Sequence, residues 1–403
     1  MFFKNLSAQW ASIIFVALLS FASTVIIARY IGPSSFGDYS LALSVGAILG
    51  IFIDGGIRTL IFKETSKPSP ELELLKDSLI GLGLAHILVV ITPLVCISIL
   101  VFDGESLKLS LATIGCFSAM VATQMNSARL RGDGQIVKDA YFLAGSRLTS
   151  FFGIMLFLMI GWRAPWQIFF VWSMLSVIYL TAFNSSLKKP KFFGLFSIYR
   201  LALPFLILDL SITVYLRSDI ILLNLFNFDQ IDVGYYSASF KICEGFIMLA
   251  TPLGMLFFRS LRRMTIPGEI VFSRISWAIR LSFIIGLLVA GTTWMISYEF
   301  VTMLFGEEFS KSVPIFQILS LMLVFVLPNA LLNQACIAID MENLAVTVAL
   351  LSAFANIALL TIVLPQYGTV GAAWVKVFTE MLVCVGLGFS LFFFGKRKFR
   401  AVF

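Results

Sequence analysis

Roughly a dozen apolar stretches, each about twenty residues long, follow one another along this chain and leave little sequence between them. The hydrocarbon core of a bilayer is about 30 Å thick, so a helix that rises 1.5 Å per residue needs roughly 20 apolar residues to cross it. Only 13% of the 403 residues are charged, whereas ordinary soluble domains carry about 25%. The sequence therefore predicts a polytopic, all-α membrane protein without a soluble domain.

The stretches predict about twelve transmembrane helices in two bundles of six around a central cavity. A connector containing Lys188 and Lys189 separates an N-terminal half, residues 1–187, from a C-terminal half, residues 188–403. A short repeated pattern, Gly-x-Tyr-Ser, begins the second helix of each half and indicates a duplication, as in many transporters. The predicted helices cover residues 9–29, 38–62, 78–102, 108–128, 140–161, 165–184, 200–226, 232–258, 275–302, 312–337, 343–364 and 369–394.

Lys and Arg are distributed unevenly between the predicted connectors. With a cytoplasmic N-terminus, eighteen fall on the cytoplasmic side and four on the outer side. This bias predicts that both termini are cytoplasmic, and it accounts for the net charge of +7 without a nucleic-acid partner. The four outer residues are Arg29, Lys108, Arg163 and Lys311.

The five cysteines and the single histidine favour neither a metal site nor nucleophilic catalysis. The cysteines lie in apolar stretches and form no CxxC motif, so we expect them to serve packing. His86 lies in the third predicted helix among small residues. We expect a hydrogen-bonded imidazole on a packing face, with a proton relay as the alternative. No metal or other cofactor is predicted.

Ionisable side chains recur within the predicted helices, where each charge costs roughly 2.5–3.5 kcal/mol on insertion scales. Several stand three or four residues from an opposite charge, a spacing that places both on one helix face. They either form ion pairs that hold helices together or line a hydrated central cavity. These residues are Asp54 with Arg58, Arg147, Asp209, Arg217, Asp219, Lys241 with Glu244, and Lys376 with Glu380.

Four sequence segments, in order along the whole chain, carry a family resemblance. They are residues 28–39 (ARYIGPSSFGDY), residues 216–219 with 233–236 (LRSD and VGYY), residues 304–319 (LFGEEFSKSVPIFQIL) and residues 367–373 (YGTVGAA). With these segments the chain resembles the polysaccharide-unit flippases of the Wzx type. The resemblance implies membership of the superfamily that includes MATE multidrug exporters and the lipid II flippase, with a cavity that opens alternately to each side of the membrane.

The resemblance also implies a cargo, namely oligosaccharide repeat units on undecaprenyl diphosphate. They would move from the cytoplasmic to the outer face of a bacterial inner membrane for O-antigen synthesis, beside membrane lipids and the polymerase and chain-length machinery. Cationic side chains suit the diphosphate, and Arg suits bidentate contact. Acids would bind a coupling H⁺ or Na⁺ or form ion pairs. We predict Arg29, Arg147, Arg217, Lys241 and Lys376 as substrate-binding cations, and Asp54, Asp209, Asp219, Glu244 and Glu380 as the acids.

Two other functions stay open at this point. A multidrug or cation exporter of the same superfamily needs a cavity dominated by acids and aromatic residues, whereas Lys and Arg here roughly match the acids within the helices. A membrane polysaccharide polymerase typically has a large outer loop with Arg and His chemistry, whereas the outer connectors here are short and lack His. We therefore predict a transporter and not an enzyme.

Overall fold

The computed structural model describes residues 2–66, 78–183, 191, 195–262, 268–339 and 341–395. Within these ranges the chain forms α-, 3-10- and π-helices joined by turns, and it contains no strand. The predicted all-α architecture is confirmed. The first helices are α1 (Phe2–Asp54), α2 (Ile57–Ser66), α3 (Leu79–Val101), α4 (Gly104–Gly132), α5 (Ile136–Met159), α6 (Pro165–Phe183) and α7 (Leu195–Leu225). The later ones are α8 (Gln230–Arg262), α9 (Gly268–Met295), α10 (Ser297–Phe305), η2 (Glu307–Ser312), α11 (Val313–Ser320), α12 (Leu323–Ala338), α13 (Glu342–Phe389) and η3 (Ser390–Gly395).

Seven of the described helices are long and apolar enough to cross a membrane, and a bent pair, Glu307–Ser320 with Leu323–Ala338, makes eight. This number counts α1 and α13 once each, although their apolar parts contain 43 and 51 residues. Each is about twice as long as the roughly 20 residues that one crossing needs. Helices α7 and α8, with 31 and 33 residues, are also long enough to cross. The predicted number of about twelve spans therefore holds as an approximate count.

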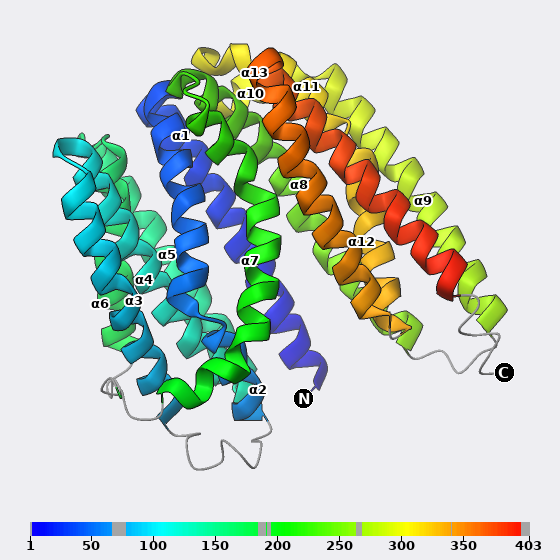
Figure 1. Cartoon of the computed structure of the whole chain (residues 1–403), viewed down its shortest axis with the longest axis horizontal. Coiled ribbons are helices and arrows are strands. Elements are labelled where there is room, and N and C mark those ends of the chain that lie inside the picture. Colours follow the sequence, from blue (N-terminus) through cyan, green and yellow to red (C-terminus); the bar gives the residue numbers. More distant parts are fainter. Residues whose placement is uncertain are drawn as a thin grey trace. The chain divides into compact units, whose positions relative to one another are not determined.

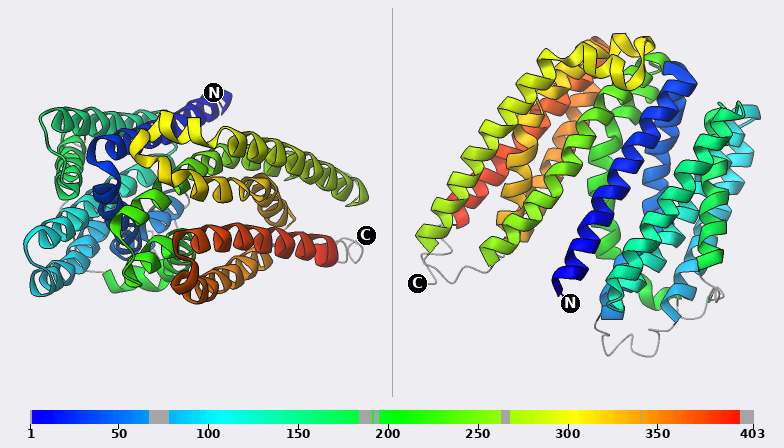
Figure 2. Two further views of the ribbon diagram at one scale, coloured as in Figure 1. Left: turned by 90° about the horizontal axis from the view of Figure 1, so that it is seen from above. Right: turned by 180° about the vertical axis from the view of Figure 1, so that it is seen from behind.

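Two glycines divide the longest helices. Gly32 in α1 has φ 76° and ψ 172°, and Gly368 in α13 has φ 55° and ψ −142°. Residues with a Cβ rarely adopt these backbone angles, which makes glycine the natural residue at such a bend. From each bend the two parts of the helix run in opposite directions (Figures 1 and 2). Two spans that the sequence predicts separately are thus joined by a turn at one glycine.

The helix that the sequence predicted over residues 38–62 is interrupted in the structure. Helix α1 instead ends at Asp54, and Gly55 and Gly56 follow with φ values of 61° and 74°. A Cβ at Gly56 would clash with the backbone of α7 at Ala202 and Leu206. The break therefore allows the start of α7 to pack directly against the backbone between α1 and α2.

The chain folds as two compact units, unit 1 with residues 1–217 and unit 2 with residues 218–403, and the division falls within α7. The boundary between residues 187 and 188 stays a prediction about the sequence repeat, because residues 184–190 lie outside the described part of the chain. The predicted cytoplasmic positions at Lys67, Lys76, Lys188, Lys189, Arg263 and residues 396–400 lie outside it as well.

Each unit has its own buried apolar core. In unit 1, Leu130, Phe142 and Leu180 bring α4, α5 and α6 together. In unit 2 a larger cluster joins α8, α9, α12 and α13, and it includes Cys336 and Cys384. The placement of these two free cysteines agrees with the packing role predicted for them.

Candidate functional site

Arg147 lies half-buried in the middle of α5. Its guanidinium group lies over the ring of Trp172 on α6, 5.0 Å from the ring centroid. The groups that act on it electrostatically are the Tyr39 hydroxyl and the Cys116 thiol, which are uncharged in their usual state at neutral pH. Within the described residues, no carboxylate pairs with Arg147. A cation held at such a depth without an acid is suited to an anionic ligand.

Arg217 of α7 is a second cation near the same tyrosine. The guanidinium groups of Arg147 and Arg217 both act electrostatically on the Tyr39 hydroxyl. Tyr39 itself is 2% exposed and stacks against Phe36 and Phe169, which fixes its position in unit 1. The fold thus brings together, around one tyrosine of α1, two cations predicted to bind substrate.

Arg29, the third cation predicted to bind substrate, lies in a different environment. Its side chain is exposed and stands three residues before the bend at Gly32. Its predicted contact with the substrate stays a prediction.

Arg58 connects three helices of unit 1. Its Nη2 atom donates to Asp209 Oδ2 of α7 at 3.0 Å, and its Nη1 atom donates to Gln124 Oε1 of α4 at 2.6 Å. The i,i+4 spacing had predicted that the side chains of Asp54 and Arg58 form a pair. In the structure, the Asp54 carboxylate accepts a hydrogen bond from the backbone N–H of Arg58 at 3.3 Å. The assignment is corrected by the break after Asp54, because the two residues do not belong to one continuous helix. Asp54 instead satisfies a backbone N–H at the start of α2.

His86 has a hydrogen-bond partner for each ring nitrogen. Its Nε2 atom lies 3.0 Å from the carbonyl oxygen of Phe52, and its Nδ1 atom lies 3.0 Å from the hydroxyl of Tyr199. A neutral imidazole satisfies both contacts if Nε2 donates to the carbonyl and Nδ1 accepts from the hydroxyl. The prediction of a hydrogen-bonded imidazole on a packing face is confirmed.

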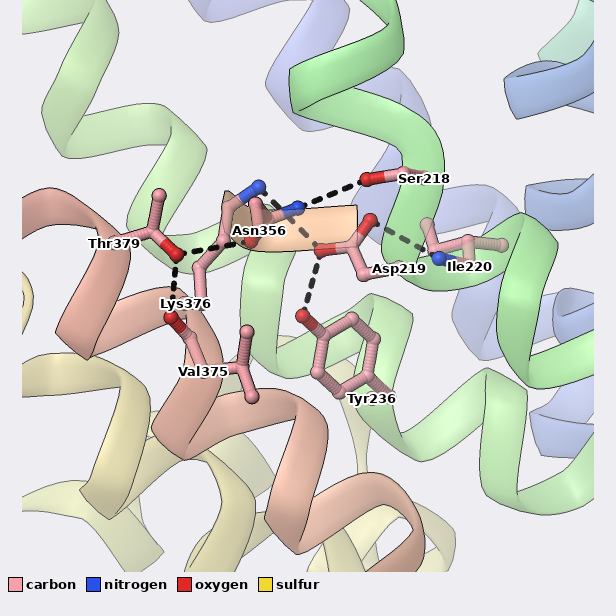
Figure 3. A network of polar contacts seen from close by, with 8 residues as sticks. All are labelled: Ser218, Asp219, Ile220, Tyr236, Asn356, Val375, Lys376 and Thr379. Atoms are coloured by element: carbon pink, nitrogen blue, oxygen red, sulfur yellow. Dashed lines mark hydrogen bonds and ion pairs between the residues drawn. The ribbon is translucent and has the colours of Figure 1, made fainter. Parts of the chain in front are cut away.

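In unit 2, a buried network of polar contacts surrounds Asp219 (Figure 3). Asp219 is the second residue of the part of α7 that belongs to this unit. The Lys376 ammonium of α13 lies 3.5 Å from Asp219 Oδ2, and both side chains are 1% exposed. The Tyr236 hydroxyl of α8 donates to the same oxygen at 2.6 Å, and the backbone N–H of Ile220 donates to Oδ1 at 3.0 Å. The ammonium also lies over the ring of Phe240, 4.8 Å from its centroid. The carboxylate is thus held by three donors in the interior of the unit.

Further hydrogen bonds extend this network through both parts of α13. The Nδ2 atom of Asn356 donates to the Ser218 hydroxyl at 3.0 Å. The Thr379 hydroxyl donates to Asn356 Oδ1 at 3.0 Å and to the Val375 carbonyl at 2.7 Å. Asn356 and Thr379 lie on opposite sides of the bend at Gly368, so the bend brings both parts of α13 to the same network.

Two other pairs of predicted residues lie in unit 2. Lys241 Nζ and Glu244 Oε2 on α8 are 2.8 Å apart, so the opposite charges at i,i+3 form an ion pair, with 14% and 15% exposed side chains. Glu380 of α13 accepts a hydrogen bond from Asn329 Nδ2 of α12 at 2.7 Å. Lys376 and Glu380 stand four residues apart on α13, but each also contacts another helix. Lys376 contacts α7 through Asp219, and Glu380 contacts α12 through Asn329.

A family model described as polysaccharide biosynthesis protein matches residues 2–258, which is more than half of the chain. The chain belongs to this family. It is also 24% identical over 374 residues to the probable low-salt glycan biosynthesis flippase Agl15 of Haloferax volcanii, covering 89% of this chain and 77% of that one. The resemblance seen in the sequence is thereby confirmed at the level of the family.

Solved structures share the fold of this polysaccharide biosynthesis protein. The lipid II flippase MurJ in an inward closed conformation superposes with a TM-score of 0.79 at 16% identity, over 95% of this chain and 87% of that one. An inward-facing multidrug resistance MATE transporter of the MOP superfamily superposes with a TM-score of 0.65 at 15% identity, over 98% of each chain. These likenesses confirm the helical membrane fold.

Sequence reasoning missed the uncharged members of these clusters. Charge within a helix identified Arg147 and Asp219, but Trp172, Asn356 and Thr379 carry no charge, and whether they face these residues depends on packing between helices. A polar residue inside an apolar stretch was the one available signal. This family member therefore has cation environments of two kinds, a half-buried one in unit 1 and a fully buried pair in unit 2.

Proposed function

We propose that this protein is a flippase that moves lipid-linked oligosaccharide units across a membrane by alternating access, without covalent chemistry. Membership of the polysaccharide biosynthesis family supports this function, as does the similarity to a protein described as a probable glycan biosynthesis flippase. The observation that carries the choice of an anionic cargo is Arg147, a half-buried cation in unit 1 with no carboxylate partner among the described residues.

The chemistry of Arg147 suits a phosphate-containing cargo. A guanidinium group is planar, and when it stacks on an aromatic ring its N–H donors stay available in the plane. Paired N–H donors match the oxygens of a phosphate better than a point charge does. In the proposed cycle Arg147 binds the diphosphate, Trp172 holds the guanidinium in place, and Arg217 adds positive charge near Tyr39.

The proposed direction and carrier follow from the sequence. The Lys and Arg bias supports cytoplasmic termini, and the flippase resemblance supports transfer from the cytoplasmic to the outer face of a bacterial inner membrane. We propose undecaprenyl-diphosphate-linked O-antigen repeat units as the cargo, with polymerase and chain-length machinery as downstream partners. The proposed driving ion is H⁺ or Na⁺, for which the sequence offers the acids Asp54, Asp209, Asp219, Glu244 and Glu380.

The test measures which face of the membrane exposes the lipid-linked sugar units. Spheroplasts with and without the protein are treated with a membrane-impermeant reagent that modifies only outward-facing glycans. We expect the outward fraction to fall on deletion and to return with the wild-type chain, but not with Arg147→Gln. The matched control is Arg163→Gln, which removes the same charge from an exposed arginine and should restore the outward fraction.

Two outcomes would contradict the proposal. If deletion leaves the outward fraction unchanged while units stay unpolymerised, the protein acts as a polymerase. If neither the outward fraction nor polymer length changes on deletion, the cargo is not a lipid-linked sugar, and export of cationic drugs is the next function to measure.

A further inference from the structure

We propose that the exposed face of α9 in unit 2 binds the phosphate of an anionic phospholipid through Arg280, beside the indole of Trp277. The site lies near the end of α9 that the Lys and Arg bias assigns to the cytoplasmic side, so we assign the ligand to that leaflet. The inference concerns the surrounding membrane and does not depend on which cargo the protein moves.

Helix α9 has one face that packs within unit 2 and an opposite face that does not. On the packed face, Phe272 and Ile275 belong to the apolar cluster that α9 shares with α8, α12 and α13. A Cβ at Gly286 would meet the backbone of α12, so the two helices are in close contact there. Helix α9 lies at the edge of unit 2 (Figures 1 and 2). Its other face exposes large apolar side chains, among them Leu281, Ile284, Leu287 and Leu288.

Two tryptophans on the exposed face indicate the levels of the two membrane surfaces. Trp277 and Trp294 are 63% and 49% exposed, and Trp is enriched where hydrocarbon meets water. The helix between them rises about 25 Å, close to the roughly 30 Å thickness of the hydrocarbon core. Arg280 stands about 4.5 Å further along the helix than Trp277, toward the apolar stretch. Its backbone therefore lies just below the level of the lipid head groups.

The Arg280 side chain is exposed at this depth and pairs with no carboxylate among the described residues. Its Nε atom donates to the backbone carbonyl of Ser276 at 3.3 Å, one turn back toward the start of α9. The guanidinium group thus extends toward the head groups, as long basic side chains do near helix ends. Four of its five N–H donors remain for phosphate oxygens, and the phosphate neutralises a charge that is costly beside hydrocarbon.

A phospholipid fits this face better than other anions do. Ile284, Leu287 and Leu288 offer an apolar surface for acyl chains on the far side of Arg280, and inorganic phosphate has nothing to place there. The indole of Trp277 adds an N–H donor at the level of the head group. The diphosphate of a lipid carrier has similar chemistry, but the cation proposed for it is the half-buried Arg147 of unit 1. Arg280 lies on a face whose natural neighbour is bulk phospholipid.

The test counts the lipids bound to the full-length chain in detergent by native mass spectrometry. Phosphatidylglycerol and phosphatidylcholine with the same acyl chains are added to wild type, Arg280→Gln and Arg280→Lys. We expect the wild type to bind phosphatidylglycerol in preference to phosphatidylcholine. Arg280→Gln should weaken binding of phosphatidylglycerol about fivefold, the usual contribution of one basic side chain at an anionic membrane surface, and leave phosphatidylcholine unaffected. Arg280→Lys keeps the charge and should keep most of the preference.

A matched control separates this site from the effect of net charge. Arg163→Gln removes the same charge from an exposed arginine outside α9 and should leave the preference unchanged. If Arg280→Gln does not fold, Trp277→Leu tests the same site, since it should weaken binding of phosphatidylglycerol more than Arg163→Gln does.

Four results would overturn the inference. The first is equal binding of the two lipids by the wild type, and the second is an unchanged affinity in Arg280→Gln or, if that variant does not fold, in Trp277→Leu. The third is an equal loss in Arg163→Gln, which would make the effect one of net charge. The fourth is displacement of phosphatidylglycerol by equimolar undecaprenyl diphosphate in the wild type but not in Arg280→Gln, which would assign the site to the carrier. The first three results leave the proposed flipping function untouched, because that function is measured by the orientation of glycans.

Discussion

Replacing Lys376 by Met leaves the Asp219 carboxylate buried without its cation. Both side chains are 1% exposed and their charged atoms lie 3.5 Å apart, so solvent cannot compensate for the loss. Removing one partner of such a buried pair typically lowers the free energy of unfolding by about 3–5 kcal/mol. Tyr236 and the backbone of Ile220 still donate to the carboxylate and keep the expected loss toward the lower end of that range.

A double-mutant cycle separates the pair from its surroundings. Lys376→Met, Asp219→Asn and the double variant are unfolded with denaturant, and the free energies of unfolding are compared. The double variant should lose less stability than the sum of the single variants, because it leaves no unpaired charge. The pair of Lys241 and Glu244 is the control, since its side chains are 14% and 15% exposed and its loss should be smaller.

The reasoning would be refuted if both single variants lost less than about 1 kcal/mol, the usual range for exposed ion pairs. It would also be refuted if the double variant lost the full sum of the two single losses, because independent effects add and a pair does not.

Three further predictions concern unit 1. Arg147→Gln should lower the flipping rate about 10- to 100-fold in a reconstituted assay with lipid-linked glycan, because hydrogen bonds to charged groups contribute about 1.5–3 kcal/mol, while Arg163→Gln should leave the rate near wild type. Gly56→Ala should lower the free energy of unfolding by about 2–5 kcal/mol, since a left-handed backbone and a clash with α7 act together; an unchanged melting curve would exclude that close contact. Asp209→Asn should cost only about 1 kcal/mol or less in the same measurement, because the Arg58 and Asp209 side chains are 31% and 26% exposed and solvent screens the pair.

The sequence predicted most of the helices because hydrocarbon imposes a simple length and composition on whatever crosses it. The same rule explains the errors within those helices. Gly55 and Gly56 stand in an apolar stretch that satisfies the rule with or without a break, so the end of α1 at Asp54 was not visible. Because of that break, the guanidinium of Arg58 forms its ion pair with Asp209 on α7 and not with its i,i+4 neighbour Asp54.

The candidate site was also only partly predictable from the sequence. Arg147 and Asp219 were predicted because a charge inside an apolar helix is costly and therefore conspicuous. Their different surroundings were not predicted, because a side chain in a helix does not reveal which neighbouring helix it faces. Only packing shows that Arg147 lies over Trp172 without an acid, whereas Asp219 is held by Lys376 from a helix more than a hundred residues away in sequence.

The sequence alone determined that the chain is an all-α membrane protein, with the approximate number of its spans and the identity of its costly charges, because each of these properties depends on composition over one helix length. The tertiary structure decided which charges are paired and which stand without an acid, because pairing depends on contacts between helices that are distant in sequence. Lys376 and Arg147 look alike in the sequence as cations inside apolar helices. The fold gives the first a buried carboxylate beside an aromatic ring and the second an aromatic ring without a carboxylate, because their neighbours come from different helices.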